Sequence, residues 1–256
     1  MVMILPVSQI LVILVLLSAG VSANGKWAAV AKWRGTHPSA SDSRAVGTVI
    51  GLCTAELIAK EWILTAEHCA TRLLKHEKDT VRVTFGESSA KVERGVTHCV
   101  KPSGADVDVV ICKLALGVGS VSPLVLNADK YTTARHGKAV MCVGTADGYH
   151  ANGPKALEYE GNGAHLYVSQ SSGSGMKAGD SGGAWIHEVS VTNATSNATT
   201  THQLLSGVIH GGSGSGKHKR GIAAQVSFIR SFIDEHTNGT ATWASASNFS
   251  TPIRRT

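Results

Sequence analysis

Ser181 stands among glycines, in the stretch Gly179-Asp180-Ser181-Gly182-Gly183-Ala184-Trp185. Glycines permit a tight turn and can direct two N–H groups, those of Gly179 and Ser181, at one point where an oxyanion would form. A serine hydroxyl is inert at neutral pH without a neighbouring base. The stretch therefore predicts a nucleophile at Ser181, with a histidine and a carboxylate supplied from elsewhere in the chain.

Candidates for both groups lie upstream of the serine. His68 follows an apolar, partly β-branched segment that starts at Leu57, and Cys69 comes directly after it. Asp108 begins the run Asp108-Val109-Val110-Ile111-Cys112-Lys113-Leu114, whose apolar residues are typical of a strand. Asp106 is the alternative carboxylate. The candidate groups thus follow one another as histidine, aspartate and serine.

These segments resemble three motifs of the chymotrypsin/trypsin-like serine protease family. The family's Thr-Ala-x-His-Cys motif matches Thr65 to Cys69, and its Gly-Asp-Ser-Gly-Gly motif matches Gly179 to Gly183. The run from Asp108 matches the family's aspartate, hydrophobic residues, Lys and Leu without a gap, which favours Asp108 over Asp106. The resemblance spans about residues 49–233, in the family's order.

The resemblance implies acyl transfer from a peptide bond to Ser181. His68 would be the general base, Asp108 would orient its imidazole, and the N–H groups of Gly179 and Ser181 would stabilise the oxyanion. It implies a polypeptide substrate and a protein inhibitor as partners, and neither a metal nor an organic cofactor. A secreted, non-catalytic homologue that binds a partner is the alternative. Such relatives usually lack one of the three residues, whereas this chain has all three.

Two other interpretations of the motifs fit the sequence less well. In an α/β-hydrolase, a helix follows the Gly-x-Ser-x-Gly turn, and the acid and the histidine come after the serine. Here residues 184–189 have the pattern of a strand, and both partners precede Ser181. A zinc site at His68 and Cys69 would need a second cysteine or histidine two to four residues away in a paired arrangement, and there is none.

Short runs rich in Val and Ile, separated by Gly, Ser, Asn and Asp, predict an all-β fold, and 28 glycines supply the turns. The resemblance implies two six-stranded Greek-key β-barrels packed together, over about residues 25–120 and 130–225. His68 and Asp108 would face the cleft between them from one side, and Ser181 from the other.

The end of the chain combines a helical pattern with a polar segment. Apolar residues recur at helical spacing over 226–237, which predicts a C-terminal helix packed on the second barrel. The protease domain would then cover residues 24–237. From 238 to 256 the residues are mostly small and polar, which predicts a loose tail.

Residues 1–23 predict a secretory signal peptide, because they are almost wholly apolar and end in Val21-Ser22-Ala23, which suits cleavage. Their length also fits a membrane anchor, and Lys26, Lys32 and Arg34 would then favour a cytoplasmic body. Four N-glycosylation motifs argue against the anchor and predict a secreted protein without stable membrane association. The motifs start at Asn193, Asn197, Asn238 and Asn248.

The formal net charge of +6 is moderate. It favours solubility, and no basic stretch carries the interleaved aromatic residues that stack on bases. We therefore expect no nucleic-acid partner.

The five cysteines form an odd set, so an exported chain would leave at least one unpaired or bonded to another chain. The resemblance implies a disulfide between Cys53 and Cys69 beside the predicted base, worth about 3 kcal/mol. Cys112 lies inside an apolar run and is interpreted as a small buried hydrophobic residue. Cys99 with Cys142 is an alternative pair that no pattern supports.

The chain lacks the activation sequence of the family's zymogens. These carry a basic residue before Ile-Val-Gly-Gly, and cleavage there creates a new N-terminus that pairs with the aspartate before the nucleophile. This tetrapeptide is absent, and the nearest candidate is Lys26-Trp27-Ala28-Ala29-Val30. A buried, unpaired carboxylate is costly. Asp180 would therefore pair with a new N-terminus at Trp27, with another cation or with backbone N–H groups.

The predicted substrate pocket lacks the charge that selects Arg or Lys. Trypsin has an aspartate six residues before its nucleophile, where this chain has Gly175. The pocket walls would include the glycines Gly211, Gly212 and Gly221. His210 and the run Lys217-His218-Lys219-Arg220 bring positive charge, so we expect cleavage after Glu or Asp, with an apolar residue as the alternative. The basic run also fits a solvated loop without a role in binding.

Overall fold

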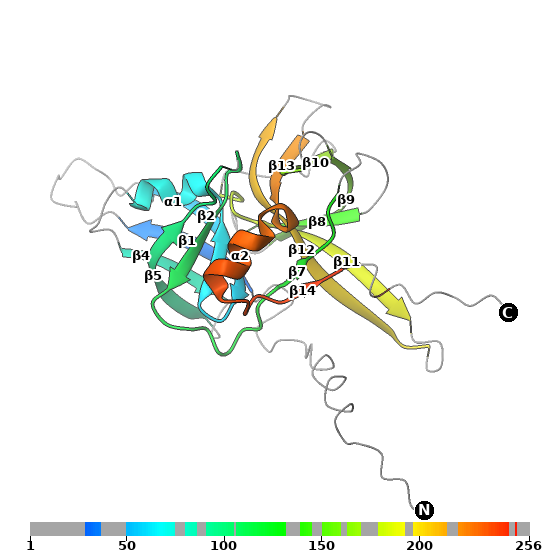
Figure 1. Ribbon diagram of the computed structural model, residues 1–256, viewed down its shortest axis with the longest axis horizontal. Coiled ribbons are helices and arrows are strands. Elements are labelled where there is room, and N and C mark those ends of the chain that lie inside the picture. The colour runs from blue at the N-terminus through cyan, green and yellow to red at the C-terminus, as the bar shows by residue number, and fades with distance from the viewer. Residues whose placement is uncertain are drawn as a thin grey trace, which may run out of the picture.

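Two systems of mainly antiparallel strands lie side by side, and short helices accompany them (Figure 1). The computed structural model describes residues 29–36, 50–74, 80–85, 91–104, 106–131, 139–144, 150–159, 163–169, 179–192, 197–213, 220–245 and 249. Several predicted features lie outside these residues. They are the signal segment 1–23, Trp27, Gly175, Lys217 to Lys219, Asn193 and Asn248.

The first system is a closed barrel of six strands in the order β1-β2-β3-β6-β5-β4. Its strands are β1 (Val30–Thr36), β2 (Ile50–Ala59), β3 (Trp62–Thr65), β4 (Thr80–Phe85), β5 (Val92–Val100) and β6 (Val110–Leu114). Helix α1 (Glu67–Leu74) follows β3 after a single residue. This barrel confirms the prediction for the first half of the chain.

The second system is a sheet in the order β11-β8-β9-β10-β13-β12-β7-β14. Its strands are β7 (Val125–Asn127), β8 (Ala139–Gly144), β9 (His150–Tyr159), β10 (His165–Ser169), β11 (Ala184–Thr192), β12 (Thr199–Ser213), β13 (Arg220–Gln225) and β14 (Trp243–Ala244). Because β11 also pairs with β12, six of these strands are joined in a ring. The all-β class with two packed barrels is thus confirmed. Strands β7 and β14, which pair in parallel at the side of β12, were not predicted.

Strand β2 shows how the barrels are held together. Its residues 53–59 are all buried, although a strand at a surface would alternate buried and exposed positions. Cys53, Ala55 and Leu57 belong to the core of the first barrel. Ile58 belongs to a second cluster, which also contains Ile186 and Val208 of the second barrel. One face of β2 therefore closes the first barrel, and the other face packs against the second.

The predicted C-terminal helix is present as a 3-10 turn over Val226–Ile229 that leads into α2 (Arg230–Thr237). Ile229 and Ile233 are buried in the cluster between the barrels. The helix ends at Asn238, which has a left-handed φ of 51° and donates its N–H to carbonyl oxygens of the last turn.

The prediction of a loose tail is wrong for residues 238–245. Strand β14 pairs in parallel with β7, and the Leu126 N–H donates to the Thr242 carbonyl at 2.8 Å. The Trp243 Nε1–H donates to Asp234 Oδ1 at 2.7 Å, and the Arg230 guanidinium lies 4.9 Å from the centre of the Trp243 ring. The composition is polar, but the exposed edge of β7 supplies backbone partners that composition does not reveal.

Cys112 is buried, as predicted, but it is disulfide-bonded and not simply a small hydrophobic residue, and the alternative pair Cys99–Cys142 is wrong. Cys99 and Cys112 form a disulfide, with Cα atoms 4.0 Å apart. They lie directly opposite each other on the antiparallel strands β5 and β6. Opposed residues of such a pair hold their side chains close together, so the register brings the two sulfurs within bonding distance.

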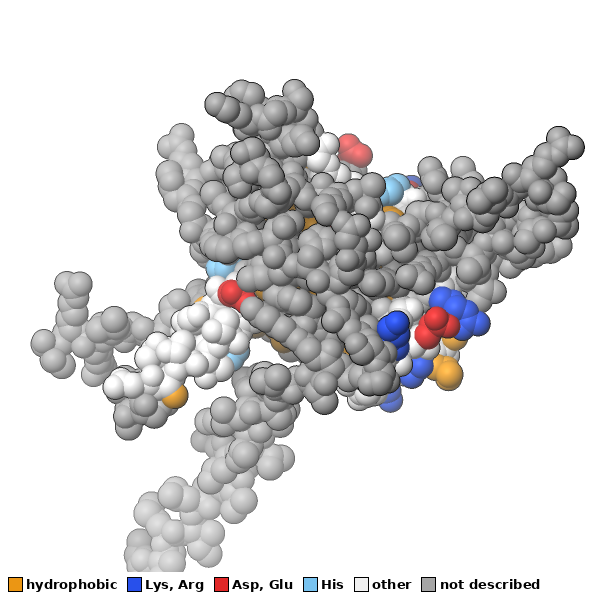
Figure 2. All heavy atoms as spheres, turned by 180° about the vertical axis from the view of Figure 1, so that it is seen from behind, with side chains coloured by type: hydrophobic (Ala, Val, Ile, Leu, Met, Phe, Trp, Pro, Cys, Tyr) orange, Lys and Arg blue, Asp and Glu red, His pale blue; other side chains and the backbone are white. Residues whose placement is uncertain are grey.

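Charged side chains gather on the flank of the first barrel, where Figure 2 shows lysines and arginines beside acidic groups. Across β4 and β5, Arg82 Nη1 lies 2.8 Å from Glu93 Oε1. The mixture of signs means that this flank does not form a uniform basic surface. Among the described residues, no helix is long and apolar enough to cross a membrane.

Candidate active site

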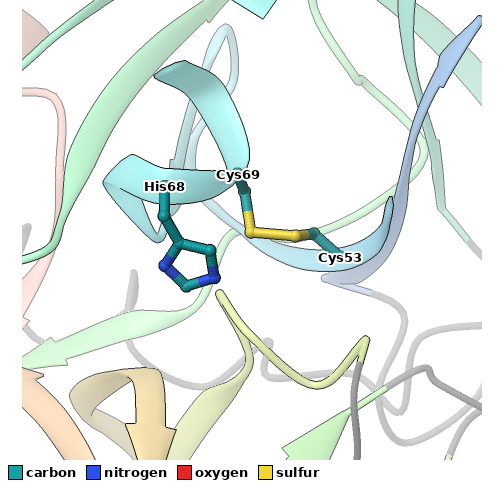
Figure 3. A group of neighbouring side chains, drawn as sticks. All are labelled: Cys53, His68 and Cys69. Atoms are coloured by element: carbon teal, nitrogen blue, oxygen red, sulfur yellow. A yellow bond between two sulfur atoms is a disulfide. The ribbon is translucent and has the colours of Figure 1, made fainter. Parts of the chain in front are cut away.

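His68 lies in the first turn of α1, directly after strand β3. A disulfide between Cys53 on β2 and Cys69 on α1 ties this turn to the barrel, with Cα atoms 6.3 Å apart. This confirms the predicted pair. Figure 3 shows the His68 ring beside the disulfide. The His68 side chain is 47% exposed, so its ring is accessible to a substrate.

Asp108 holds His68 at two points. Its Oδ2 lies 2.6 Å from His68 Nδ1, and its Oδ1 accepts the His68 backbone N–H at 2.9 Å. An ionised carboxylate only accepts, so the imidazole carries its proton on Nδ1 and leaves Nε2 as the basic nitrogen. The alternative carboxylate, Asp106, is exposed.

The charge of Asp108 is stabilised by its neighbours. Burial disfavours the charged form, but the hydrogen bonds from His68 and the charges of His68 and His210 outweigh it, so the pKa of Asp108 lies below its ordinary value. Asp108 therefore stays ionised at neutral pH. It is positioned by Val107 and Val109, which flank it and are buried in the cluster between the barrels.

The nucleophile turn depends on two glycines with positive φ. Gly179 has a φ of 102° and Gly182 a φ of 81°, which side-chain-bearing residues rarely adopt. A Cβ on Gly182 would lie 2.0 Å from the Thr54 carbonyl oxygen and 2.3 Å from Thr65 Oγ1. The turn is closed by the Gly183 N–H, which donates to the Asp180 carbonyl at 2.8 Å.

The nucleophile turn is hydrogen-bonded to strand β2 of the first barrel. The Thr54 N–H donates to the Ser181 carbonyl at 2.7 Å, and Thr54 Oγ1 donates to the Gly179 carbonyl at 3.0 Å. Cys69 Sγ lies 3.8 Å from the same Ser181 oxygen. Because Cys69 follows His68 in the chain, these contacts bring Ser181 next to the His68–Asp108 pair.

The backbone N–H groups of the nucleophile turn fall into two pairs. The N–H groups of Gly182 and Gly183 are used inside the protein, since they donate to the Ile209 and Asp180 carbonyls. Those of Gly179 and Ser181 have no acceptor among the described residues. They are the pair that the sequence assigned to the oxyanion, and they remain available to an incoming oxygen.

His210 is a second histidine near Asp108 Oδ2. Its Nδ1 is 3.9 Å from Asp108 Oδ2, and its Nε2 is 3.3 Å from His165 Nδ1 on β10. Burial lowers the pKa of His210, as do the nearby His165 and His68, while Asp108 acts in the opposite direction. His165 was not predicted from the sequence, because only the pairing of β10 with β13 and of β13 with β12 brings it near His210.

A family model described as Trypsin matches residues 33–233. The chain belongs to the trypsin family. The matched segment contains all three candidate catalytic residues and both barrels except for the first three residues of β1 and for β14, and it identifies a trypsin-like serine protease domain, a family whose substrates are polypeptides. A search of curated proteins found no match.

In this trypsin-family chain, the described glycines that were predicted to line the substrate pocket lie on two paired strands. On β12, Gly211 pairs with Ile222 of β13, and Gly212 pairs with Gly221. A Cβ on Gly211 would have no atom of the described residues within 4 Å. His210 precedes these glycines, but its ring lies beside Asp108.

Cys53, His68 and Cys69 place three potential metal-ligating atoms within 4.8 Å of one another. Metals bind cysteine as the thiolate. Both sulfurs are joined in the disulfide, so this group does not offer the ligand set of a zinc site.

Asp180 is 1% exposed, as expected for the residue before the nucleophile. The candidate N-terminus at Trp27 lies outside the described residues. Thr54 is the residue that sequence reasoning missed. Its role rests on contacts with a segment about 125 residues away, for which no local pattern exists.

Proposed function

We propose that this protein is a secreted serine endopeptidase that uses Ser181, His68 and Asp108 and forms an acyl-enzyme. The observation that carries the proposal is the two-point hold of Asp108 on His68, at 2.6 and 2.9 Å. This hold supports His68 Nε2 as the base for Ser181, because it keeps the ring proton on Nδ1.

The reaction follows from these positions. His68 Nε2 takes the Ser181 proton as Oγ attacks the peptide carbonyl carbon, and the ionised Asp108 stabilises the imidazolium. The N–H groups of Gly179 and Ser181 donate to the carbonyl oxygen as it gains negative charge. The imidazolium then protonates the leaving amine, and water hydrolyses the acyl-enzyme by the same steps.

Secretion is supported by three features of different origin. Residues 1–23 have the composition of a signal peptide. The disulfides Cys53–Cys69 and Cys99–Cys112 fit an oxidising compartment. Two of the four glycosylation motifs lie on described, exposed residues, Asn197 at the tip of the β11–β12 hairpin and Asn238 at the end of α2.

We propose cleavage after Glu or Asp, with an apolar residue as the second preference, and not after Arg or Lys. Gly175 stands where trypsin has its charged selector. The glycine-lined pair of β12 and β13 leaves room for a side chain, and the net charge of +6 favours an acidic one.

A peptide library assayed with the secreted protein tests both the catalytic role of Ser181 and the proposed cleavage preference. Wild-type protein should cleave after acidic or apolar residues, and Ser181→Ala should lower kcat by several orders of magnitude while the yield of secreted protein is unchanged. If Ser181→Ala retained turnover, Ser181 would not be the nucleophile. Cleavage after Arg or Lys would overturn the pocket assignment and leave the mechanism in place.

A further inference from the structure

His210 lies close to Asp108, the proposed catalytic carboxylate. It lies between Asp108 and His165, with Nδ1 at 3.9 Å from Asp108 Oδ2 and Nε2 at 3.3 Å from His165 Nδ1. Its side chain is 15% exposed, which is half the exposure of the Asp108 side chain at 29%. His210 therefore faces the protein interior more than the solvent.

The chemistry of the neighbouring atoms orients the His210 ring. Asp108 Oδ2 already accepts from His68 and, as an ionised oxygen, cannot donate. At 3.9 Å the two groups do not form a hydrogen bond, but the negative oxygen favours a proton on the His210 nitrogen that faces it. The neutral ring with its proton on Nδ1 then offers Nε2 as an acceptor for His165 Nδ1–H.

Three ionisable groups face His210 from the elements around it in the described part of the chain. They are Asp108 from the segment before β6, His165 from β10 and His68 from α1. Tyr167 is further away and contacts His165, with ring centres 6.5 Å apart. Burial favours the neutral form of His210, in agreement with the orientation that its neighbours require.

We propose that His210, backed by His165, is a positioning residue that directs the Asp108 carboxylate toward His68. The positive end of its Nδ1–H bond attracts Oδ2 at 3.9 Å, the same oxygen that His68 Nδ1 binds at 2.6 Å, while the His68 backbone N–H binds Oδ1. The inference rests on the proposed function and assigns His210 to the triad and not to the substrate's side chain. His165 sets the tautomer of His210 and so acts through it.

The test compares kcat and KM in four variants. His210→Ala should lower kcat about tenfold to a hundredfold, the effect of a small misplacement of a catalytic group, with KM changed by less than about twofold. His210→Asn, whose amide nitrogen reaches about the position of Nδ1, should restore most of the lost kcat. His165→Phe should lower kcat less than His210→Ala. His202→Ala, on the same strand but with its ring stacked on Phe249, is the matched control and should leave kcat unchanged.

A second readout does not need turnover. The low-field ¹H NMR resonance of the His68 Nδ1–H in the bond to Asp108 should shift in His210→Ala and return toward its wild-type position in His210→Asn. The same spectra can be recorded in Ser181→Ala, so failure of the proposed function does not obscure the result. An unchanged kcat and resonance in His210→Ala would overturn the proposal. So would a rise in KM confined to substrates with an acidic side chain, which would place His210 in substrate binding.

Discussion

Gly182 lies so close to Thr54 that a Cβ atom on the glycine would be 2.0 Å from the Thr54 carbonyl oxygen. The turn that carries Ser181 therefore docks on strand β2 by direct backbone contact. The same strand holds Cys53, whose disulfide fixes the turn that carries His68. One strand of the first barrel thus sets the relative positions of the nucleophile and the base.

Replacement of Gly182 by alanine should displace this turn. The φ of 81° and the contact with Thr54 both oppose a side chain. We expect Gly182→Ala to lower kcat/KM at least about a hundredfold and the free energy of unfolding by about 1–3 kcal/mol. Steady-state kinetics and urea unfolding measure the two effects. Gly119→Ala is the control, since a Cβ there meets no atom within 4 Å; equal losses in both variants would contradict the role of this contact.

Removing the two disulfides one at a time should distinguish their effects on stability from their effects on activity. The pairs Cys53–Cys69 and Cys99–Cys112 close loops of similar length, with sequence separations of 16 and 13. Replacing either pair by alanine should lower the free energy of unfolding by about 3 kcal/mol. Only loss of Cys53–Cys69 should also lower kcat strongly, because only this bond adjoins His68. Thermal unfolding and kinetics below both midpoints provide the comparison, and a similar kcat in the two variants would contradict the account.

Asp108 and Asp106 offer a matched pair of substitutions. Asp108→Asn removes the ionised oxygens that hold His68 and should lower kcat by about 10⁴-fold. Asp106→Asn changes an exposed residue and should leave kcat unaffected. A large loss in Asp106→Asn with a small one in Asp108→Asn would reverse the assignment of the carboxylate.

The buried Glu56 should make the free energy of unfolding depend on pH. It is fully buried on β2, and its carboxyl oxygens have no hydrogen-bond partner among the described residues. Burial raises its pKa well above the ordinary value, so the folded state keeps a proton that the unfolded state releases. Glu56 therefore lowers the free energy of unfolding as the pH rises above the unfolded pKa, until the folded pKa is reached.

Glu56→Leu should remove this dependence. Relative to wild type, the variant should gain stability as the pH rises from 5 to 8, by at most about 1.4 kcal/mol per pH unit. Urea unfolding at both values measures the gain. Glu93→Gln, which alters an exposed glutamate that pairs with Arg82, is the control. A difference between Glu56→Leu and wild type that is the same at both pH values would show that ionisation of Glu56 is not its cause.

The sequence predicted those parts of the fold and site that depend on local patterns. His68, Asp108 and Ser181 each stand in a short motif, and the barrels and the helix at 226–237 follow from apolar runs with recognisable spacing. The Cys53–Cys69 disulfide was predicted from the family resemblance. None of these predictions required knowledge of which strands pair.

What the sequence did not predict depends on strand register over long separations. Cys99 meets Cys112 because β5 and β6 align them, and His165 meets His210 because β13 lies between their strands. Strand β14 forms because β7 presents a free edge. Neither residue composition nor periodicity encodes these alignments, so the loose tail was predicted in error and the Cys99–Cys112 disulfide was missed.

The most direct test of the central claim is labelling with a fluorophosphonate probe, which reacts rapidly only with a serine activated by an assembled triad. Mass spectrometry of the secreted wild-type protein should find the label on Ser181, with none on Ser181→Ala and a strongly reduced rate for Asp108→Asn. Failure of the wild type to react, or equal labelling of Ser181→Ala, would contradict the claim that His68, Asp108 and Ser181 act as one catalytic unit.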